Sequence, residues 1–372
     1  MKKILILMSK TGNGHKKIAE TLKDTINELY PKEYKIKIVD VFEDYANLIL
    51  RKSVTPYEKF VKYTPTVYAL GFYSTDNKPS TIILENIMAT QTHKKLERLI
   101  GTYKPDLVIS THPMVNRITS RILKRAHTPF VILISDVYNV HQFWFDKNAT
   151  LHIAPNKYIE TQCLKKGIKN VITYPIPVSK NFAEKVNKSQ IYKKYNLTPK
   201  KMTILITSGG TATVKSSKVI QSLDDLYNRF QIIVVNGRNE KEKRKIDKIN
   251  TKIKFVNLGF VDNMHELMSI ADLILTKAGA VTMQEIFTKK KVSIIIEHIK
   301  GHESENLKFI KKENLAIIPI DDISKEILRI TRNQEKMKEI QNNEKMFSDV
   351  KSRIKIIKKI LPLINNENPT RY

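Results

Sequence analysis

Short apolar runs alternate with longer amphipathic segments along most of the chain. The runs are rich in Ile, Val and Leu, whereas segments such as 16–29 and 304–312 carry apolar residues at helical spacing. This alternation predicts parallel α/β sheets with helices between the strands. The expected strands are Ile4–Met8, Lys35–Val41, Asp106–Ser110, Phe130–Ser135, Leu151–Ala154 and Val171–Tyr174, then Thr203–Thr207, Gln231–Asn236, Ile253–Asn257, Leu273–Thr276, Val292–Ile296 and Ala316–Pro319.

The two series of strands predict two doubly wound domains, each with its ligand-binding loops at the carboxyl ends of the strands. A polar, Lys-rich stretch flanked by prolines lies at 174–201 and marks the boundary. We therefore expect domains over 1–178 and 179–330. Beyond Asp322 the pattern is helical to about Ile364, so that residues 331–372 form a separate C-terminal segment that includes the basic run 351–359.

Residues 45–80 interrupt the regular order with aromatic and basic side chains. The aromatic residues recur at roughly helical spacing, which favours an amphipathic surface that meets a lipid bilayer with anionic headgroups. The basic run 351–359 is a second candidate for such a surface. The alternative is a buried pair of helices with a solvated Lys face. The aromatic residues are Tyr57, Phe60, Tyr63, Tyr68, Phe72 and Tyr73, and the basic residues are Arg51, Lys52, Lys59 and Lys62.

Composition narrows the classes of partner. The chain has 372 residues, of which 41% are hydrophobic and 27% charged, as in an ordinary globular protein. Its formal net charge of +28 favours an anionic partner, but the sequence contains no nucleic-acid-binding motif, so we expect no nucleic acid. The single cysteine, Cys163, excludes an intramolecular disulfide and favours the cytoplasm. No apolar run approaches the ~18 residues of a membrane span, so any membrane contact should be peripheral.

The loop after the first expected strand carries candidate chemistry. It reads Ser9-Lys10-Thr11-Gly12-Asn13-Gly14-His15, and its glycines let backbone N–H groups approach a ligand at the start of the next helix. It matches neither GxGxxG nor a P-loop. A neutral His15 at this position could take a proton from a bound hydroxyl. The alternative is that His15 only caps the helix.

Four segments of the second half also join strands to helices. Backbone donors in Ser208-Gly209-Gly210-Thr211 suit a diphosphate, and Arg238 in NGRN (236–239) could pair with a phosphate or be solvated. Segments 277–285 and 301–306 place carboxylates after strands, where Glu285 could accept both hydroxyls of a ribose. The alternative for each is a capped helix with a solvated acidic face. There is no DxD triplet and no metal-ligand spacing, so we expect no metal.

Together these motifs resemble the diacylglycerol glycosyltransferases of the monogalactosyldiacylglycerol synthase type, a group that includes processive diacylglycerol glucosyltransferases. The resemblance runs from residue 4 to about residue 320. SKTGNGH (9–15), THP (111–113), SD (135–136) and HQFW (141–144) resemble the family motifs of the first half. NGRN, GFV (259–261), TKAGAVTMQE (276–285) and GHESEN (301–306) resemble those of the second half. Two residues depart from the family pattern, Asn13 in the first loop and His302 in place of a glutamine.

The resemblance implies a GT-B architecture, with a nucleotide-sugar cleft between two Rossmann-like domains and a C-terminal helix that crosses back to the first. It implies an inverting, metal-independent transfer, with no cofactor beyond the donor, UDP-glucose or UDP-galactose. It also implies that the acceptor is diacylglycerol or its monoglycosyl product. The first domain is expected to bind both this acceptor and the membrane surface. The expected location is the inner face of the cytoplasmic membrane. An alternative is the same fold with a polyprenyl-linked or soluble glycan acceptor.

The resemblance also assigns roles to individual residues. His15 is the expected general base. The expected acceptor-binding residues are Thr11, Gly12, Asn13, Gly14, His112, Asp136 and Trp144. The expected donor-binding residues are Ser208, Gly209, Gly210, Thr211, Arg238, Phe260, Val261, Lys277, Gly279, Thr282, Glu285, Glu303 and Asn306.

Overall fold

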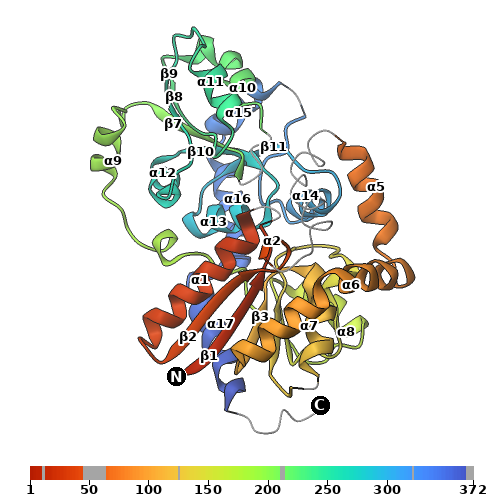
Figure 1. The fold of residues 1–372 in the computed structure, drawn as a ribbon. Helices are drawn as coiled ribbons and strands as arrows, with labels where there is room; N and C mark the ends of the chain where they lie inside the picture. Colours follow the sequence, from red (N-terminus) through yellow and green to blue (C-terminus); the bar gives the residue numbers. More distant parts are fainter. Residues whose placement is uncertain (11–12, 45–63, 125, 210–213, 321, 366–372) are drawn as a thin grey trace. The chain divides into compact units, whose positions relative to one another are not determined.

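The computed structural model describes residues 1–10, 13–44, 64–124, 126–209, 214–320 and 322–365 (Figure 1). Residue contacts divide the chain into two compact units. The first unit comprises 1–179, 300–306 and 349–372, and the second comprises 180–299 and 307–348. The segment 300–306 therefore groups with the first unit, although its sequence position predicts the second.

The first unit is built on a six-stranded sheet in which every pairing is parallel. The strand order is β2-β1-β3-β4-β5-β6, so the order in which successive strands are added to the sheet reverses between β1 and β3. In sheets of this kind, ligands bind where the strand order reverses. The strands are β1 (Lys2–Met8), β2 (Tyr34–Asp40), β3 (Leu107–Ser110), β4 (Phe130–Leu133), β5 (Leu151–Ala154) and β6 (Val171–Thr173).

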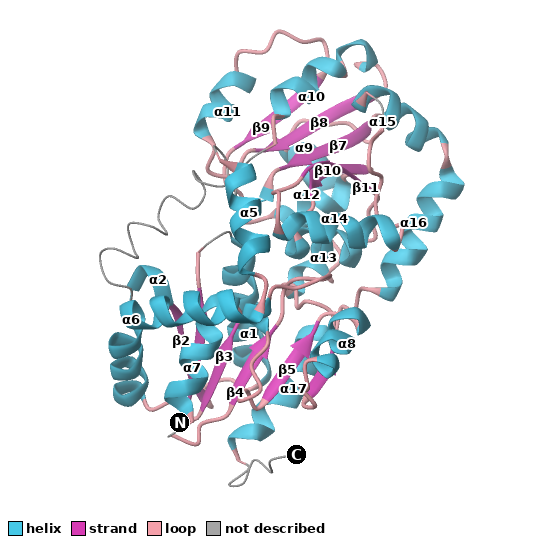
Figure 2. Ribbon diagram, turned by 90° about the vertical axis from the view of Figure 1, so that its right-hand side faces the viewer, coloured by secondary structure: helices cyan, strands magenta, loops and turns pink. Residues whose placement is uncertain are grey.

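Helices lie beside the strands of this sheet (Figure 2). Strands such as β1 and β4 are apolar runs buried on both faces, which is typical of a parallel sheet covered on both sides. The helices are α1 (Asn13–Leu29), α2 (Val41–Asp44), α5 (Pro65–Thr75), α6 (Lys78–Tyr103), α7 (Asn116–Leu123), α8 (Lys157–Lys165) and α17 (Ser352–Ile360), with 3₁₀ turns η1 (Pro113–Val115), η2 (Gln142–Trp144) and η6 (Leu361–Ile364).

The second unit has a five-stranded parallel sheet of order β11-β10-β7-β8-β9, with its reversal between β7 and β10. Its strands are β7 (Met202–Thr207), β8 (Phe230–Val235), β9 (Lys254–Leu258), β10 (Leu273–Lys277) and β11 (Ser293–Glu297). Its helices are α9 (Lys188–Lys194), α10 (Ser216–Ser222), α11 (Glu240–Ile246), α12 (Met264–Ile270), α13 (Ala280–Lys289), α15 (Ile323–Arg332) and α16 (Gln334–Met346). Helix α14 (His302–Lys312) begins in the segment that groups with the first unit.

The strand predicted over Ala316–Pro319 is not formed. Only an isolated bridge joins Ile317 to Ile294 of β11. The run is short, and Pro319 cannot donate a hydrogen bond to a neighbouring strand, which explains why pairing does not extend. Most other expected strands differ from the observed ones by a residue or two at their ends.

The C-terminal segment divides between the units. Helices α15 and α16 belong to the second unit, whereas α17 belongs to the first and lies against α1 (Figure 1). The buried guanidinium of Arg353 in α17 donates to Thr25 Oγ1 at 3.3 Å and to both carboxylate oxygens of Glu28 at 2.9 and 3.2 Å. Among the described residues, no helix has both the length and the apolar character needed to span a bilayer.

Removing the Arg353 contacts should loosen α17 from α1. We predict that Arg353→Met lowers the free energy of unfolding of the first unit by about 1–3 kcal/mol, because hydrogen bonds to a charged group are lost. Lys358→Met changes an exposed residue of the same helix and should alter stability by no more than about 0.5 kcal/mol. Urea denaturation of both variants measures the difference, and equal losses would contradict the anchoring role of Arg353.

Candidate active site

His15 lies in the first turn of α1, directly after the loop that follows β1. Its Nδ1 is 2.5 Å from the backbone carbonyl oxygen of Thr111, the residue that follows β3. A carbonyl oxygen only accepts hydrogen bonds, so Nδ1 of the neutral ring carries the proton and Nε2 carries the lone pair. The contact therefore makes Nε2 the nitrogen that can accept a proton.

Burial of the His15 side chain favours its neutral form. Burial lowers the pKa of His15, and the carboxylate of Asp136 opposes this effect. The buried ring of His112 meets the His15 ring edge-on, with 4.6 Å between centroids, and burial holds the pKa of His112 well below its ordinary value. Ser135 Oγ lies 3.3 Å from His15 Nδ1. Near neutral pH, this environment favours an uncharged imidazole that can accept a proton.

The loop after β4 brings Asp136 and Trp144 to the same place. Trp144 is fully buried, its indole centroid lies 6.3 Å from that of His15, and its Nε1 donates to Asp136 Oδ2 at 2.7 Å. The structure thus gathers His112, Asp136 and Trp144 around His15, and Asn13 and Gly14 begin the helix that carries it. Two further predicted acceptor-binding residues, Thr11 and Gly12, lie outside the described residues.

In the second unit, the ends of three neighbouring strands collect small and basic residues. Gly209 follows β7 and has a φ of +60°, a conformation that favours glycine. A Cβ placed on Gly209 would lie 3.4 Å from Lys277 Cε, at the end of β10, and 3.5 Å from Thr282 Oγ1, in the first turn of α13. Gly237 follows β8, also has a positive φ (+58°), and a Cβ on it would lie 3.6 Å from the Gly209 carbonyl.

The other described donor candidates of this unit follow β7, β8, β9 or β10 or lie in α13. Ser208 is buried, and its Oγ accepts from Val214 N at 3.2 Å. The Arg238 guanidinium lies 5.9 Å from the ring centroid of Phe260, which is 64% exposed. Gly279 is the N-cap of α13, and Glu285 is buried within that helix. Val261 follows Phe260 in the chain. Gly210 and Thr211 lie outside the described residues.

Glu303 and Asn306 are buried in the first turns of α14, in the segment that groups with the first unit. His302, one of the two departures from the family pattern, lies 3.0 Å through Nδ1 from the hydroxyl of Tyr68 on α5. The carboxylate of Glu305 accepts from Tyr73 OH at 3.2 Å and from Asn139 Nδ2 at 2.7 Å. Glu305 is not among the residues predicted from sequence, because nothing in its spacing distinguishes it from its acidic neighbours.

The acceptor that fixes the His15 tautomer is also absent from the residues predicted from sequence, because it is the main-chain carbonyl of Thr111. The signal was present, since Thr111 directly follows an expected strand and the ends of parallel strands meet at one edge of a sheet. As for metals, the described part of the chain holds no group of three His, Cys, Asp or Glu side chains arranged as ligands.

Comparison with solved structures defines the class of fold. UDP-GlcNAc 2-epimerase from Neisseria meningitidis has a TM-score of 0.64 at 13% identity and covers 97% of this chain and 100% of its own. MurG from Acinetobacter baumannii has a TM-score of 0.61 at 12% identity, with the same coverage. The chain is thus an α/β protein of two Rossmann-like units of the GT-B type.

Comparison with known sequences gives the family. Residues 15–178 match the monogalactosyldiacylglycerol (MGDG) synthase family, and residues 203–360 match the glycosyltransferase family 28 C-terminal domain. The chain belongs to the family of MGDG synthases and processive diacylglycerol glucosyltransferases.

Relatives in this family come from plants and bacteria. A probable chloroplastic MGDG synthase of Glycine max is 28% identical over 83% of this chain, which spans only 61% of that protein. A processive diacylglycerol beta-glucosyltransferase of Bacillus licheniformis is 26% identical, over 92% of this chain and 90% of the relative.

The geometry around His15 predicts its protonation behaviour in solution. Nitrogen NMR of the labelled chain should show Nδ1 protonated and Nε2 unprotonated, with a titration midpoint below the ordinary value of ~6.5. Asp136→Asn should lower that midpoint further, because the Asp136 carboxylate favours the protonated form. A neutral imidazole protonated on Nε2, or a midpoint that rises in Asp136→Asn, would contradict the geometry.

Proposed function

We propose that the chain transfers a hexose, with inversion, from UDP-glucose or UDP-galactose to the free hydroxyl of diacylglycerol. The monoglycosyl product is a second acceptor. The observation that carries this proposal is His15, whose Nδ1–H donates to the Thr111 carbonyl and leaves Nε2 as a base, in a chain of this family. The two relatives' names supply both hexoses, since one is an MGDG synthase and the other a glucosyltransferase.

In the proposed reaction, the acceptor hydroxyl gives its proton to His15 Nε2 as its oxygen attacks the anomeric carbon. A new C–O bond forms on the face opposite the diphosphate, the bond from the anomeric carbon to the diphosphate oxygen breaks, and UDP leaves with the electron pair. The Asp136 carboxylate stabilises the imidazolium that forms, since it favours the charged form of His15. Trp144 holds that carboxylate in place through its indole N–H.

The donor is assigned to the strand ends of the second unit. Gly209 and Gly237 let the loops after β7 and β8 approach each other closely, and the start of α13 supplies backbone N–H groups and the positive end of a helix dipole. Lys277 supplies positive charge where the leaving group gains negative charge. We assign the ribose to Glu285 and the hexose to Glu303 and Asn306.

The decisive assay supplies UDP-glucose or UDP-galactose together with diacylglycerol vesicles and resolves the lipid products. We expect a glycolipid from at least one donor. His15→Ala should lower kcat by ~10²–10⁴-fold while UDP affinity stays near wild type, because only proton transfer is lost. His127→Asn changes an exposed histidine and is the matched control.

The outcomes separate the competing functions. Absence of glycolipid with either donor would overturn the proposal. Transfer to a polyprenyl-linked or soluble glycan alone would favour the other acceptor class. A His15→Ala variant as active as His127→Asn would remove the base assignment.

We also propose that the first unit docks on an anionic membrane at the cytoplasmic face through α5 and α6. Large apolar side chains are exposed on both helices, at Val67 and Leu70 of α5 and at Ile83 and Ile87 of α6. Each pair lies three or four residues apart, hence on one face of its helix. Helix α6 also exposes Lys94, Lys95 and Arg98, which suit anionic headgroups.

This surface differs from the aromatic stripe expected from sequence. Tyr68 and Phe72 contact His302 with ring centroids 6.0 and 6.4 Å away, and a Cβ on Gly301 would lie 3.2 and 3.4 Å from them. The two aromatic residues thus pack within the first unit, because the helical repeat places them opposite Val67 and Leu70. The expected stripe residues Tyr57, Phe60 and Tyr63 lie outside the described residues.

Vesicle flotation tests this docking surface. Leu70→Ser with Ile87→Ser should lower partitioning by about 10-fold or more, because burying one such side chain contributes roughly 1.5–3 kcal/mol. Ile320→Ser removes an apolar side chain that is 89% exposed in the second unit and is the control. Added salt should weaken binding through screening. Unchanged binding of the double variant, or binding indifferent to lipid charge, would contradict the assignment.

A further inference from the structure

Helix α5 has two chemically different faces. Val67 and Leu70 are 57% and 72% exposed on one face. Tyr68, Phe72 and Thr75 follow one another at intervals of four and three residues and form the other face, which is only partly exposed. This second face contacts the loop that carries Asp136 and Trp144.

The contact centres on His141, a buried residue of that loop. Its Nδ1 lies 3.2 Å from the backbone N–H of Phe143, which can only donate, so Nδ1 is the acceptor and the neutral ring carries its proton on Nε2. Nε2 lies 3.2 Å from Thr75 Oγ1 and therefore donates to it. Thr75 Oγ1 in turn donates to the Gly71 carbonyl at 2.7 Å. The Phe72 carbonyl, 3.1 Å from Thr75 Oγ1, is a second acceptor for the same hydroxyl, so each donor in this series of hydrogen bonds has an acceptor.

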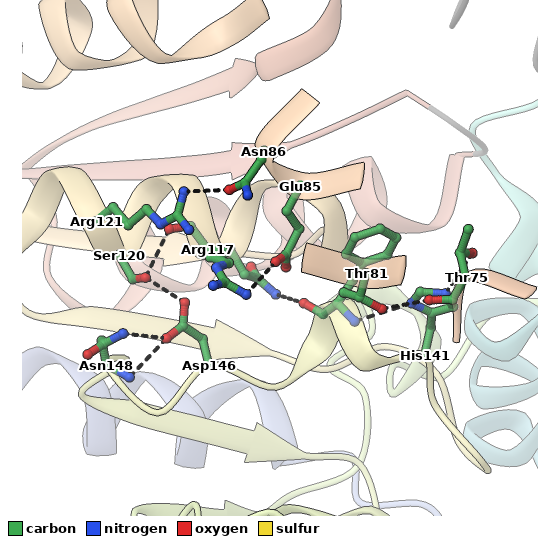
Figure 3. Close-up of polar contacts among 12 residues, drawn as sticks. Thr75, Thr81, Glu85, Asn86, Arg117, Ser120, Arg121, His141, Asp146 and Asn148 are labelled. Atoms are coloured by element: carbon green, nitrogen blue, oxygen red, sulfur yellow. Dashed lines mark hydrogen bonds and ion pairs between the residues drawn. The ribbon is translucent and has the colours of Figure 1, made fainter. Parts of the chain in front are cut away.

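Packing and further hydrogen bonds reinforce the contact. The His141 ring stacks on Phe143, with centroids 4.4 Å apart, and lies 5.2 Å from the ring of Phe72. Gln142 N donates to Asp76 Oδ1 at 2.9 Å, and Thr81 of α6 donates to the Thr75 carbonyl at 2.6 Å. Figure 3 shows Thr75, Thr81 and His141 in one line of polar contacts. The C-terminal end of α5 is therefore fastened to residues 141 and 142.

The same loop closes on itself beside the base. Trp144 Nε1 donates to Asp136 Oδ2, while Asn116 Nδ2 of α7 donates to the Phe143 carbonyl at 3.0 Å. The charged groups that face His141 are Asp76 and Asp136, and Asp136 also faces His15. Displacement of His141 would therefore be transmitted through Trp144 to the carboxylate beside His15.

We propose that Thr75 and His141 are positioning residues, whose hydrogen bond sets the place of Asp136 relative to the base His15. The role rests on the proposed function, since it assigns His15 as the base. Helix α5, which is proposed to contact the membrane through one face, would thus also position the loop of residues 136–144 through the other. Neither residue touches the reacting atoms, and both act through the loop of residues 136–144.

The test compares Thr75→Val, which removes the hydroxyl at nearly constant volume, with Thr75→Ser, which keeps it. Ser74→Ala removes the exposed neighbouring hydroxyl and is the matched control. In Thr75→Val we expect kcat to fall about 10-fold or more, with KM for the UDP-sugar within about twofold of wild type. Thr75→Ser and Ser74→Ala should stay near wild type.

A second readout distinguishes positioning from a loss of stability. If Asp136 moves away from His15, the pKa of His15 falls, so the acid limb of the kcat profile and the NMR titration of His15 both move to lower pH. An unchanged His15 midpoint in Thr75→Val would overturn the proposal, even if the variant is less stable. Should Thr75→Val not fold, His141→Phe keeps the stacked ring without its hydrogen bonds, and the same midpoint decides.

The NMR titration needs no turnover, so it separates this proposal from the proposed function. A wild-type chain that makes no glycolipid, yet shows the midpoint shift in Thr75→Val, overturns the function and supports the positioning contact. A wild-type chain that makes glycolipid, with a His15 midpoint that is unchanged in Thr75→Val, supports the function and overturns the positioning contact.

Discussion

The hydrogen bond from His15 Nδ1 to the Thr111 carbonyl is the contact on which the proposed chemistry of the first unit depends. It joins the loops that follow β1 and β3, which are paired in parallel, Ile4 with Leu107 through Leu7 with Ser110. Because parallel strands end at the same edge, that pairing brings residues 96 positions apart within hydrogen-bond distance. The bond fixes the tautomer of His15 and so decides which nitrogen can accept a proton.

In the second unit, the same constraint brings a different set of residues together. Strands β7, β8 and β10 are neighbours, and their carboxyl ends bring Gly209, Gly237 and Lys277 together. Backbone groups and a helix N-terminus favour negative charge there, whereas the first unit offers imidazoles and a carboxylate. In the proposed function, each unit supplies one half of the chemistry of a transfer from a nucleotide sugar.

Sequence patterns predicted the strands and the loops after them because burial on both faces leaves nearly continuous apolar runs, as in Phe230–Val235. The same patterns placed His15, Gly209 and Lys277 at strand ends. They failed for Ala316–Pro319, a short apolar run that ends in a proline and pairs with β11 only at Ile317. They also failed to show which face of α5 is exposed, because apolar residues occur on both faces of that helix.

Contacts between distant segments could not be read from spacing. Thr75 and His141 are 66 residues apart, and neither belongs to a pattern that predicts the other. The grouping of residues 300–306 with the first unit depends on their contacts with α5, which local sequence does not encode. The candidate site was therefore predictable in its strand-end residues, whereas the contacts that hold it in place required the tertiary structure.

The central claim is that the strand ends of the second unit hold the nucleotide while His15 of the first serves as the base. A crystal structure with UDP bound tests it most directly. We expect the diphosphate beside Gly209 and Gly237, with its oxygens accepting from backbone N–H groups of the β7 loop and the start of α13, and with Lys277 Nζ close by. A UDP molecule seated against His15, or one that leaves the Gly209 loop unoccupied, would contradict the account.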